Sequence, residues 1–366
     1  MNLKQGRIGV FEGVCLAAAA LCVNGVFGLD PEYAYSKGNS TYLSLPLALM
    51  LALEIMLLLI KAAERTGSRD LAELMTDCFG GVLGVILTIP VLAGFVFCAA
   101  RPMTAFLEVL HRLIYDGVGY TSILAYVIPV TVFIAWKGFE SMGRLAAVFA
   151  GIMLAAFVFA AVSAAPDFEV YRLYPLIGEG PGRFAAFTLS ELVFFIPPLL
   201  GLLVNAKGLS GLAFVKKISF RAAIFAAVIC GVTQLCVALI YPYGILSGLL
   251  MPLYRLNFLN LAHSYALRLD KIFIMIWLNG CIITAAYCIY SAALLYSKLF
   301  RQRDVTPAAA AFSLIVCGTV LAKAGKSFGF VYTADRFLTR YGAAAAAFPA
   351  VSAALVGLIK KRKVKA

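Results

Sequence analysis

The sequence has little charge and almost no histidine. Only 13% of its 366 residues are Asp, Glu, Lys or Arg, and His111 and His263 are its two histidines. A soluble domain carries about 25% charged residues, so this composition excludes an ordinary soluble domain. The nine cysteines form no Cys-x-x-Cys pair or Cys/His cluster, so we expect small core residues rather than metal ligands or disulfides. We therefore expect neither a metal nor a cofactor.

The sequence also lacks the short motifs of soluble enzymes. It contains no GxSxG, HExxH or SxxK pattern. Gly325-Lys326-Ser327 resembles the end of a phosphate-binding loop, but Val320 stands where that motif has glycine, and no strand precedes it. We therefore expect no enzymatic activity.

What the chain has in abundance is long apolar runs. Hydrophobic residues make up 63% of it, and the mean hydropathy is +0.94. Crossing a bilayer takes about 20 apolar residues as a helix. The runs predict an all-α polytopic membrane protein, a single membrane domain over residues 1–366 with ten transmembrane helices. The predicted spans are 8–28, 43–61, 82–110, 120–136, 143–164, 184–204, 218–241, 270–297, 306–323 and 341–359.

The formal net charge of +13 fits this topology. Lys and Arg are more numerous in the loops on the side of both termini than in the opposite loops, and cytoplasmic loops carry such an excess. We therefore expect both termini in the cytoplasm and a lipid bilayer as the partner of the basic loops. No basic run is interleaved with exposed aromatics, so we expect no nucleic acid partner.

Two spans contain features that interrupt a helix. The first ends in Asn24-Gly25-Val26-Phe27-Gly28, and the sixth contains Pro197-Pro198. Proline removes a backbone donor, and broken helices in corresponding positions of two halves point to a transporter-type binding site. The pattern predicts a five-plus-five inverted repeat of the LeuT-like type, with repeats over about 8–164 and 184–359 and with broken helices 1 and 6.

Among the charged residues that the predicted spans contain, we single out five, Glu12, Glu54, Arg101, Glu108 and Glu191. Each costs about 2.5–3.5 kcal/mol at the centre of a membrane helix, so each needs a partner or a cavity. Two interpretations of Arg101 remain open, an ion pair between helices and an anchor for an anionic ligand group. Glu191 could likewise bind a ligand ammonium group or lock the helix bundle.

The breaks predict where a ligand would bind. Exposed backbone at Gly25 and Gly28 suits a zwitterion, although both glycines also suit a helix C-terminus. Spans three and eight are expected to flank the breaks. The predicted ligand-binding residues are Asn24, Gly25, Gly28, Phe97, Arg101, Glu191, Phe194, Phe195, Pro197, Thr284 and Tyr287.

Three segments resemble a known family. They are Leu267-Arg268-Leu269-Asp270-Lys271-Ile272-Phe273-Ile274-Met275-Ile276-Trp277, Gly138-Phe139-Glu140-Ser141-Met142-Gly143-Arg144, and the loop from Tyr174-Pro175-Leu176 to Pro181. The chain resembles the spore-germination B subunits, which are similar to transporters of the amino acid–polyamine–organocation superfamily. Residues 28–31 and 37–42 depart from the family's pattern.

The resemblance implies a nutrient sensor in the inner spore membrane or cell membrane. It would bind a small-molecule nutrient, an amino acid or similar solute, and signal to A-type and C-type receptor subunits. Two alternatives stay open: a secondary amino-acid transporter, and a membrane scaffold for an A subunit that binds no solute. Uptake into proteoliposomes would identify a transporter, and saturable binding without uptake would identify a receptor.

Overall fold

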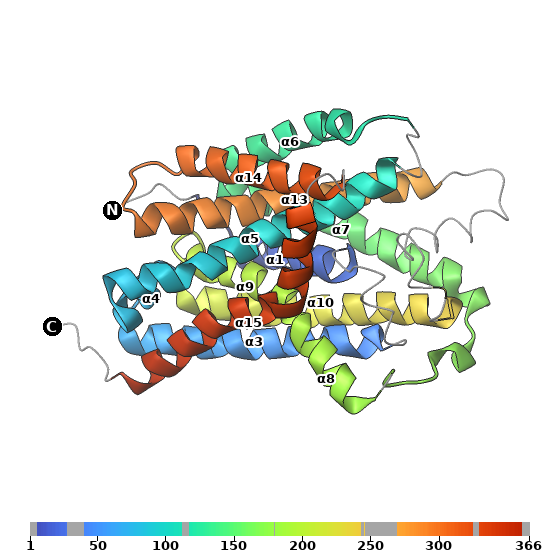
Figure 1. Ribbon diagram of the computed structural model, residues 1–366, viewed down its shortest axis with the longest axis horizontal. Coiled ribbons are helices and arrows are strands. Elements are labelled where there is room, and N and C mark those ends of the chain that lie inside the picture. The colour runs from blue at the N-terminus through green and yellow to red at the C-terminus, as the bar shows by residue number, and fades with distance from the viewer. Residues whose placement is uncertain are drawn as a thin grey trace.

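The computed structural model describes residues 6–27, 40–111, 117–178, 180–242, 245, 269–324 and 329–360. These residues form helices and no strand (Figure 1). The α-helices are α1 (Val10–Phe27), α3 (Thr41–Thr66), α4 (Leu71–Phe79), α5 (Gly81–Val109), α6 (Tyr120–Lys137), α7 (Phe139–Ala164), α8 (Pro181–Ser190), α9 (Leu192–Val204), α10 (Leu212–Ile240), α13 (Leu269–Leu299), α14 (Thr306–Ala324) and α15 (Gly329–Ile359). Two short 3₁₀ turns, Ala165–Asp167 and Val170–Leu173, follow α7.

Eight segments of the described chain are helical, long and apolar enough to cross a membrane, with α8 and α9 counted as one. The apolar helical stretches Thr306–Ala322 and Ala344–Ile359 are shorter. All ten predicted spans coincide with helices, and the chain is a multi-pass membrane protein. The number of crossings, ten, stays a prediction.

Two helices differ from the sequence prediction. The segment after α3 forms a short helix, α4, where only a loop was expected. Asp70 caps its first turn through a hydrogen bond from the backbone N–H of Glu73 (3.1 Å), and Gly80, with φ of +82°, ends it. α15 begins at Gly329, well before the predicted span. The segment 242–268, between the predicted spans 218–241 and 270–297, lies almost wholly outside the described residues.

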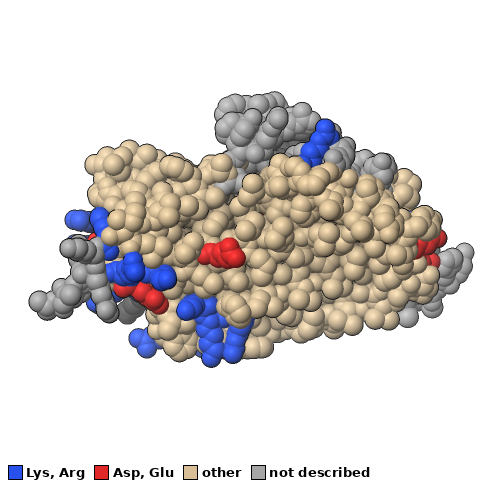
Figure 2. All heavy atoms as spheres, turned by 90° about the horizontal axis from the view of Figure 1, so that it is seen from below, with Lys and Arg blue, Asp and Glu red and all other residues tan. Residues whose placement is uncertain are grey.

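Both ends of the described chain lie at the same end of the bundle. The backbone N–H of Ile8 donates to Gly208 O in the turn between α9 and α10 (3.1 Å). Lys360 Nζ donates to Asp77 O in α4 (2.5 Å), and ion pairs join α4 to the α9–α10 turn. This arrangement agrees with the even number of crossings that the sequence predicts. Figure 2 shows Lys and Arg gathered toward one end of the face it presents.

Burial separates central from peripheral helices. Within the apolar windows, 94% of the α8–α9 residues and 89% of the α13 residues are buried, against 17% for the window that begins at α7. A helix that is apolar all round belongs inside a bundle. α9 contacts α1, α3, α5, α10, α13 and α15, so it lies inside the bundle (Figure 1).

Candidate ligand site

The sixth span is divided, but at Glu191 and not at the two prolines. α8 ends at Ser190 and α9 begins at Leu192. Glu191 keeps right-handed helical angles, yet Phe194 N–H bonds back to Glu191 O (3.0 Å), the tighter spacing of a helix end. The predicted position of the break, Pro197-Pro198, is wrong because both prolines lie inside α9.

The neighbouring helix α5 explains why α9 tolerates two prolines. Pro197 and Pro198 have no N–H, so the carbonyl groups of Val193 and Phe194 lose their helical donors. The thiol of Cys98 in α5 donates to both oxygens, at 3.4 Å and 3.8 Å. The helix therefore stays closed because a donor from another helix replaces the missing hydrogen bonds.

The first span is not unwound where a break was predicted. α1 remains helical through Asn24, Gly25, Val26 and Phe27, while Gly28 lies outside the described residues. The Asn24 amide donates to Ala20 O one turn earlier (2.9 Å). The prediction of exposed backbone at Gly25 is therefore wrong for the described residues.

Gly25 serves close packing instead. A Cβ atom built on it would lie 2.9 Å from Cys230 Sγ and 3.0 Å from the ring of Phe195. Real Cβ atoms essentially never come as close as the first of these contacts. The absence of a side chain lets α1 approach α9 and α10, and this explains the glycine without a helix break.

Arg101 of α5 is stacked on two phenylalanines. Its guanidinium lies 4.7 Å from the ring centre of Phe194 and 5.4 Å from that of Phe97, and the two rings stack at 5.9 Å. Only 6% of Arg101 and 1% of Glu191 is exposed, and the charge of Arg101 acts on Glu191. Cation–π contacts of a desolvated guanidinium are worth about 2 kcal/mol. The arrangement keeps a guanidinium and a carboxyl group inside the bundle, beside the start of α9.

α13 closes the other side of α9. The hydroxyl of Tyr287 donates to Pro198 O at 2.8 Å, and a Cβ on Gly201 would lie 2.5 Å from that hydroxyl oxygen. Thr284 is fully buried one turn before Tyr287 on the same helix. α13 is therefore held against α9 by a hydrogen bond to the backbone and by a glycine contact.

The predicted site residues thus come together around α9, except for Gly28, of which nothing is described. Three of their polar atoms are buried without a hydrogen-bond partner among the described residues: Asn24 Oδ1, Glu191 Oε2 and Thr284 Oγ1. Buried polar groups are normally paired, so these three atoms are exceptions to that rule.

Large side chains occupy the region where α5 meets the start of α9, which we call the junction: Phe97, Phe194 and Phe195 are all buried there. Two apolar cavities, of about 340 Å³ between α1, α7 and α10 and about 270 Å³ between α7 and α10, lie elsewhere, and none of the predicted residues lines them.

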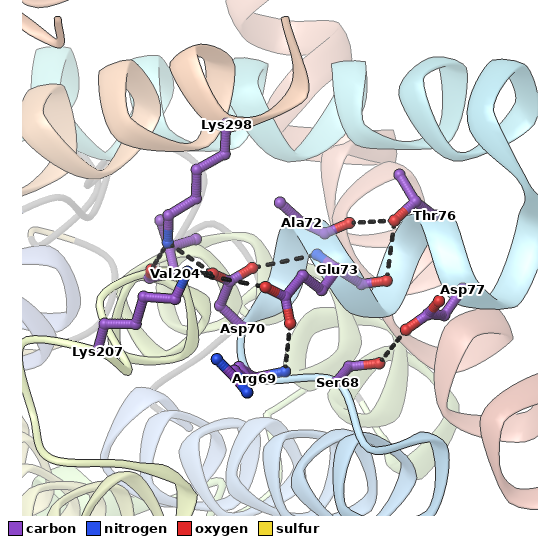
Figure 3. Close-up of polar contacts among 10 residues, drawn as sticks. All are labelled: Ser68, Arg69, Asp70, Ala72, Glu73, Thr76, Asp77, Val204, Lys207 and Lys298. Atoms are coloured by element: carbon purple, nitrogen blue, oxygen red, sulfur yellow. Dashed lines mark hydrogen bonds and ion pairs between the residues drawn. The ribbon is translucent and has the colours of Figure 1, made fainter. Parts of the chain in front are cut away.

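A second polar group lies at the opposite end of α9 (Figure 3). Lys298 Nζ pairs with Asp70 Oδ2 at 2.9 Å and donates to Val204 O at 2.6 Å. Lys207 lies 3.7 Å from both Asp70 and Glu73. We call Asp70, Glu73, Lys207 and Lys298 the inner cluster.

Sequence reasoning missed the inner cluster. It counted Lys207 and Lys298 only as charges of basic loops and did not consider Asp70. The signal was Asp70-x-x-Glu73, the spacing of a helix N-terminal capping pair. It predicts a helix start after a membrane span and a carboxylate held near that span's end.

Comparison with known proteins identifies a family by sequence. Residues 8–325 match the spore germination protein family. No curated protein matches the chain by sequence.

Among solved structures, the chain is similar to Mhp1, a nucleobase-cation-symport-1 family transporter, in a closed conformation with bromovinylhydantoin bound. The TM-score is 0.67 at 12% identity, covering 92% of this chain and 78% of Mhp1. A Na⁺-coupled sialic acid symporter in a substrate-bound outward-open state gives 0.65 at 9% identity, covering 93% and 78%.

The Eremococcus coleocola manganese transporter, in complex with an aromatic bis-isothiourea substituted compound, gives a TM-score of 0.60 at 13% identity, covering 92% of this chain and 76% of the transporter. At such identities the similarity concerns the fold alone. The chain has the LeuT-like fold of these transporters, and neither its family match nor these neighbours are enzymes.

Proposed function

Because the chain belongs to the spore germination protein family, we propose that it is the nutrient-sensing membrane subunit of a spore germination receptor and binds an amino acid or a similar small solute. The observation that carries the proposal is that Arg101, stacked on Phe194, and Glu191, three residues before Phe194 in the chain, are both buried inside the bundle. An amino acid carries a carboxylate and an ammonium group on one carbon atom. The carboxylate is complementary to the guanidinium of Arg101, and the ammonium group is complementary to the side chain of Glu191.

The arrangement supports one orientation of the ligand. The carboxylate binds the guanidinium of Arg101, and the ammonium group binds Glu191, whose Oε2 has no hydrogen-bond partner among the described residues. The ligand side chain packs on Phe97 and Phe194. This orientation replaces the expected contact with backbone N–H groups at Gly25, because those groups lie within an intact helix.

Binding is coupled to a change in shape because the junction is filled. Phe194 lies under Arg101, so a ligand that pairs with Arg101 displaces this ring. A ligand shifts a conformational equilibrium only by binding one state better than the other. The displaced ring belongs to α9, which passes the change to the inner cluster at its other end.

Equilibrium binding tests the site. The purified chain in lipid nanodiscs is titrated with radiolabelled common amino acids, and we expect saturable binding of at least one. Glu191→Gln keeps the shape of the side chain and removes the charge, so we expect at least about tenfold weaker binding, as for a lost charge-assisted hydrogen bond. The control is Glu64→Gln, at an exposed carboxylate near the end of α3. Unchanged binding in Glu191→Gln would remove Glu191 from the site, and the absence of binding by all amino acids would contradict the proposal.

The second candidate is a secondary amino-acid transporter, which the fold shared with symporters favours. Accumulation of the bound amino acid in proteoliposomes distinguishes it from a receptor, which binds without uptake. A non-binding scaffold, the third candidate, gives neither signal.

The proposal extends to location and partners. The end of the bundle that holds the inner cluster faces the cytoplasm, with both termini, and the protein works with A-type and C-type subunits in the inner spore membrane. Figure 2 supports the orientation because basic residues gather at one end. Tags placed after Lys365 and within 207–217 should report the cytoplasm, and a tag within 165–183 should report the outer side. Tags at 165–183 and 207–217 on one side would contradict the orientation.

A further inference from the structure

One carboxylate lies on the outer face of a predicted membrane span. Glu54 is in the middle of α3, and its side chain is exposed. It belongs to a stripe of exposed residues with Leu43, Leu47 and Leu58, which are 43–44% exposed. No hydrogen bond or ion pair joins Glu54 to another residue in the described part of the chain.

The packing of α3 against α10 gives the depth of Glu54. The two helices are antiparallel: a Cβ on Gly231, near the end of α10, would lie 3.0 Å from Pro46 Cγ, near the start of α3, while Lys207, before α10, pairs with Asp70, after α3. Lys61 follows Pro46 by 15 residues in α3, and Lys216 precedes Gly231 by 15 residues in α10. The two lysines therefore lie at the same height along the antiparallel pair. This level marks the polar boundary of the span, since both lysines are exposed. Glu54 lies seven residues deeper, about 10 Å at 1.5 Å per residue.

A carboxylate at this depth facing lipid is costly. Ionisable residues in membrane helices almost always face the bundle interior or a cavity, because a charge in contact with lipid tails loses its hydration. The short side chain of Glu54 does not span the distance to the polar boundary. An exposed carboxylate is therefore expected to be covered by another group in the assembled protein.

The chain's own cation at a similar depth is Arg221 of α10, five residues beyond Lys216. Glu54 forms no ion pair with it. Arg221 is exposed, and its side chain is long enough to extend toward the boundary as snorkelling arginines do. The side chain of Glu54 is too short to reach the boundary. The charge on this face that lacks a partner is therefore the negative one.

We infer that the α3 stripe Leu43, Leu47, Glu54 and Leu58 docks a transmembrane helix of a different protein, which places a Lys, Arg or His side chain against Glu54. The stripe repeats with the three- and four-residue spacing that packs helices side by side. A second copy of this chain is the poorer occupant, because a two-fold contact through the stripe brings two Glu54 carboxylates together. This interface is independent of the solute site, which lies inside the bundle.

Site-specific photo-crosslinking tests the inference. A benzophenone amino acid replaces Leu58 in the full-length chain, produced in its source organism, and the adduct is sequenced by mass spectrometry. The expected adduct is one membrane-spanning segment with a basic residue at the depth of Glu54. Val148, 68% exposed on α7, is the control position and should give no adduct with that segment.

The charge is tested in the same assay. Glu54→Leu should lower the adduct yield by roughly three- to twentyfold, the effect of one polar contact between membrane helices. Glu64→Leu, at the boundary of α3, should leave the yield unchanged. Glu54→Lys should abolish the adduct, and a basic-to-Glu change in the captured helix should restore it.

Several results would overturn the inference. They are adducts with lipid alone, an adduct with a second copy of the chain, and a yield that Glu54→Leu leaves unchanged. A fourth is an equal loss of yield in Arg221→Gln, since it would show that Glu54 pairs within its own chain. Glu54→Gln, which keeps the side-chain shape, covers the case in which Glu54→Leu accumulates poorly.

Discussion

The two ends of α9 differ in how their polar groups are paired. At its inner end, Lys298 meets both Asp70 and the carbonyl of Val204, and Lys207 adds a second cation. At its start, Glu191 has an oxygen without a hydrogen-bond partner among the described residues, and Arg101 is stacked on aromatic rings. A paired polar network fixes one arrangement of helices, while a partly satisfied one leaves binding capacity for a ligand. One helix thus joins a rigid inner cluster to an adaptable junction.

Lys298→Met should have the largest effect on stability. It leaves the carboxylate of Asp70, 1% exposed, without its closest cation, and removing one partner of a buried pair costs about 3–5 kcal/mol. Thermal unfolding in detergent measures the loss. Lys207→Met is the matched control, since Lys207 is 42% exposed and 3.7 Å from Asp70, and it should cost less than about 1 kcal/mol. Equal losses of stability in the two variants would show that the Lys298–Asp70 pair does not fix the packing of α13 against α4 and α9.

Gly25→Leu should follow, with a loss of about 1–3 kcal/mol from overpacking against Cys230 and Phe195. Gly151→Leu is the control, because nothing lies within 4 Å of a Cβ at that helical glycine. The measurement is again the unfolding temperature. A mild effect at Gly25 would mean that α1 separates readily from α9 and α10, which would extend the adaptable region to α1.

Tyr287→Phe should cost about 1 kcal/mol, because the carbonyl of Pro198 loses the hydroxyl donor at 2.8 Å. Tyr126→Phe, at a residue 81% exposed on α6, should change nothing measurable. If ligand affinity rises in Tyr287→Phe while stability falls, this hydrogen bond holds the junction in its closed form. Unchanged unfolding temperature would show that another group satisfies the carbonyl.

Cys98→Ala should have the smallest effect, at or below about 1 kcal/mol, since a thiol is a weak donor. It removes the contacts to Val193 O and Phe194 O that replace the hydrogen bonds lost at the prolines. Cys98→Ser keeps a donor and should restore most of the stability. Cys317→Ala, at a partly buried position in α14, is the control.

The sequence led to much of the fold because membrane spans are local signals. The apolar runs coincide with helices, and the family match agrees with the resemblance seen in Leu267–Trp277 and Gly138–Arg144. α4 was missed because a short amphipathic helix after a span has no apolar run. The inner cluster was missed because its members come from α4, the α9–α10 turn and α13.

The roles of the helix-breaking residues show where local reasoning stops. Pro197-Pro198 predicted a break by an intrinsic property, the lack of an N–H group. The structure keeps α9 closed because Cys98, about a hundred residues earlier in the chain, supplies a donor. Gly25 likewise predicted exposed backbone, and it instead allows contact with Phe195 and Cys230.

By itself the sequence determined a multi-pass helical membrane protein with a nearly complete set of spans, because the hydrophobic requirement acts on each span separately. It also singled out Arg101 and Glu191, since a charge in an apolar run is costly wherever the run lies. Only the tertiary structure decided that the division of the sixth span falls at Glu191, that Phe194 lies under Arg101 and that Glu54 faces outward. Each of these depends on which helix lies beside which, and contacts between distant segments leave no periodic signal in the chain.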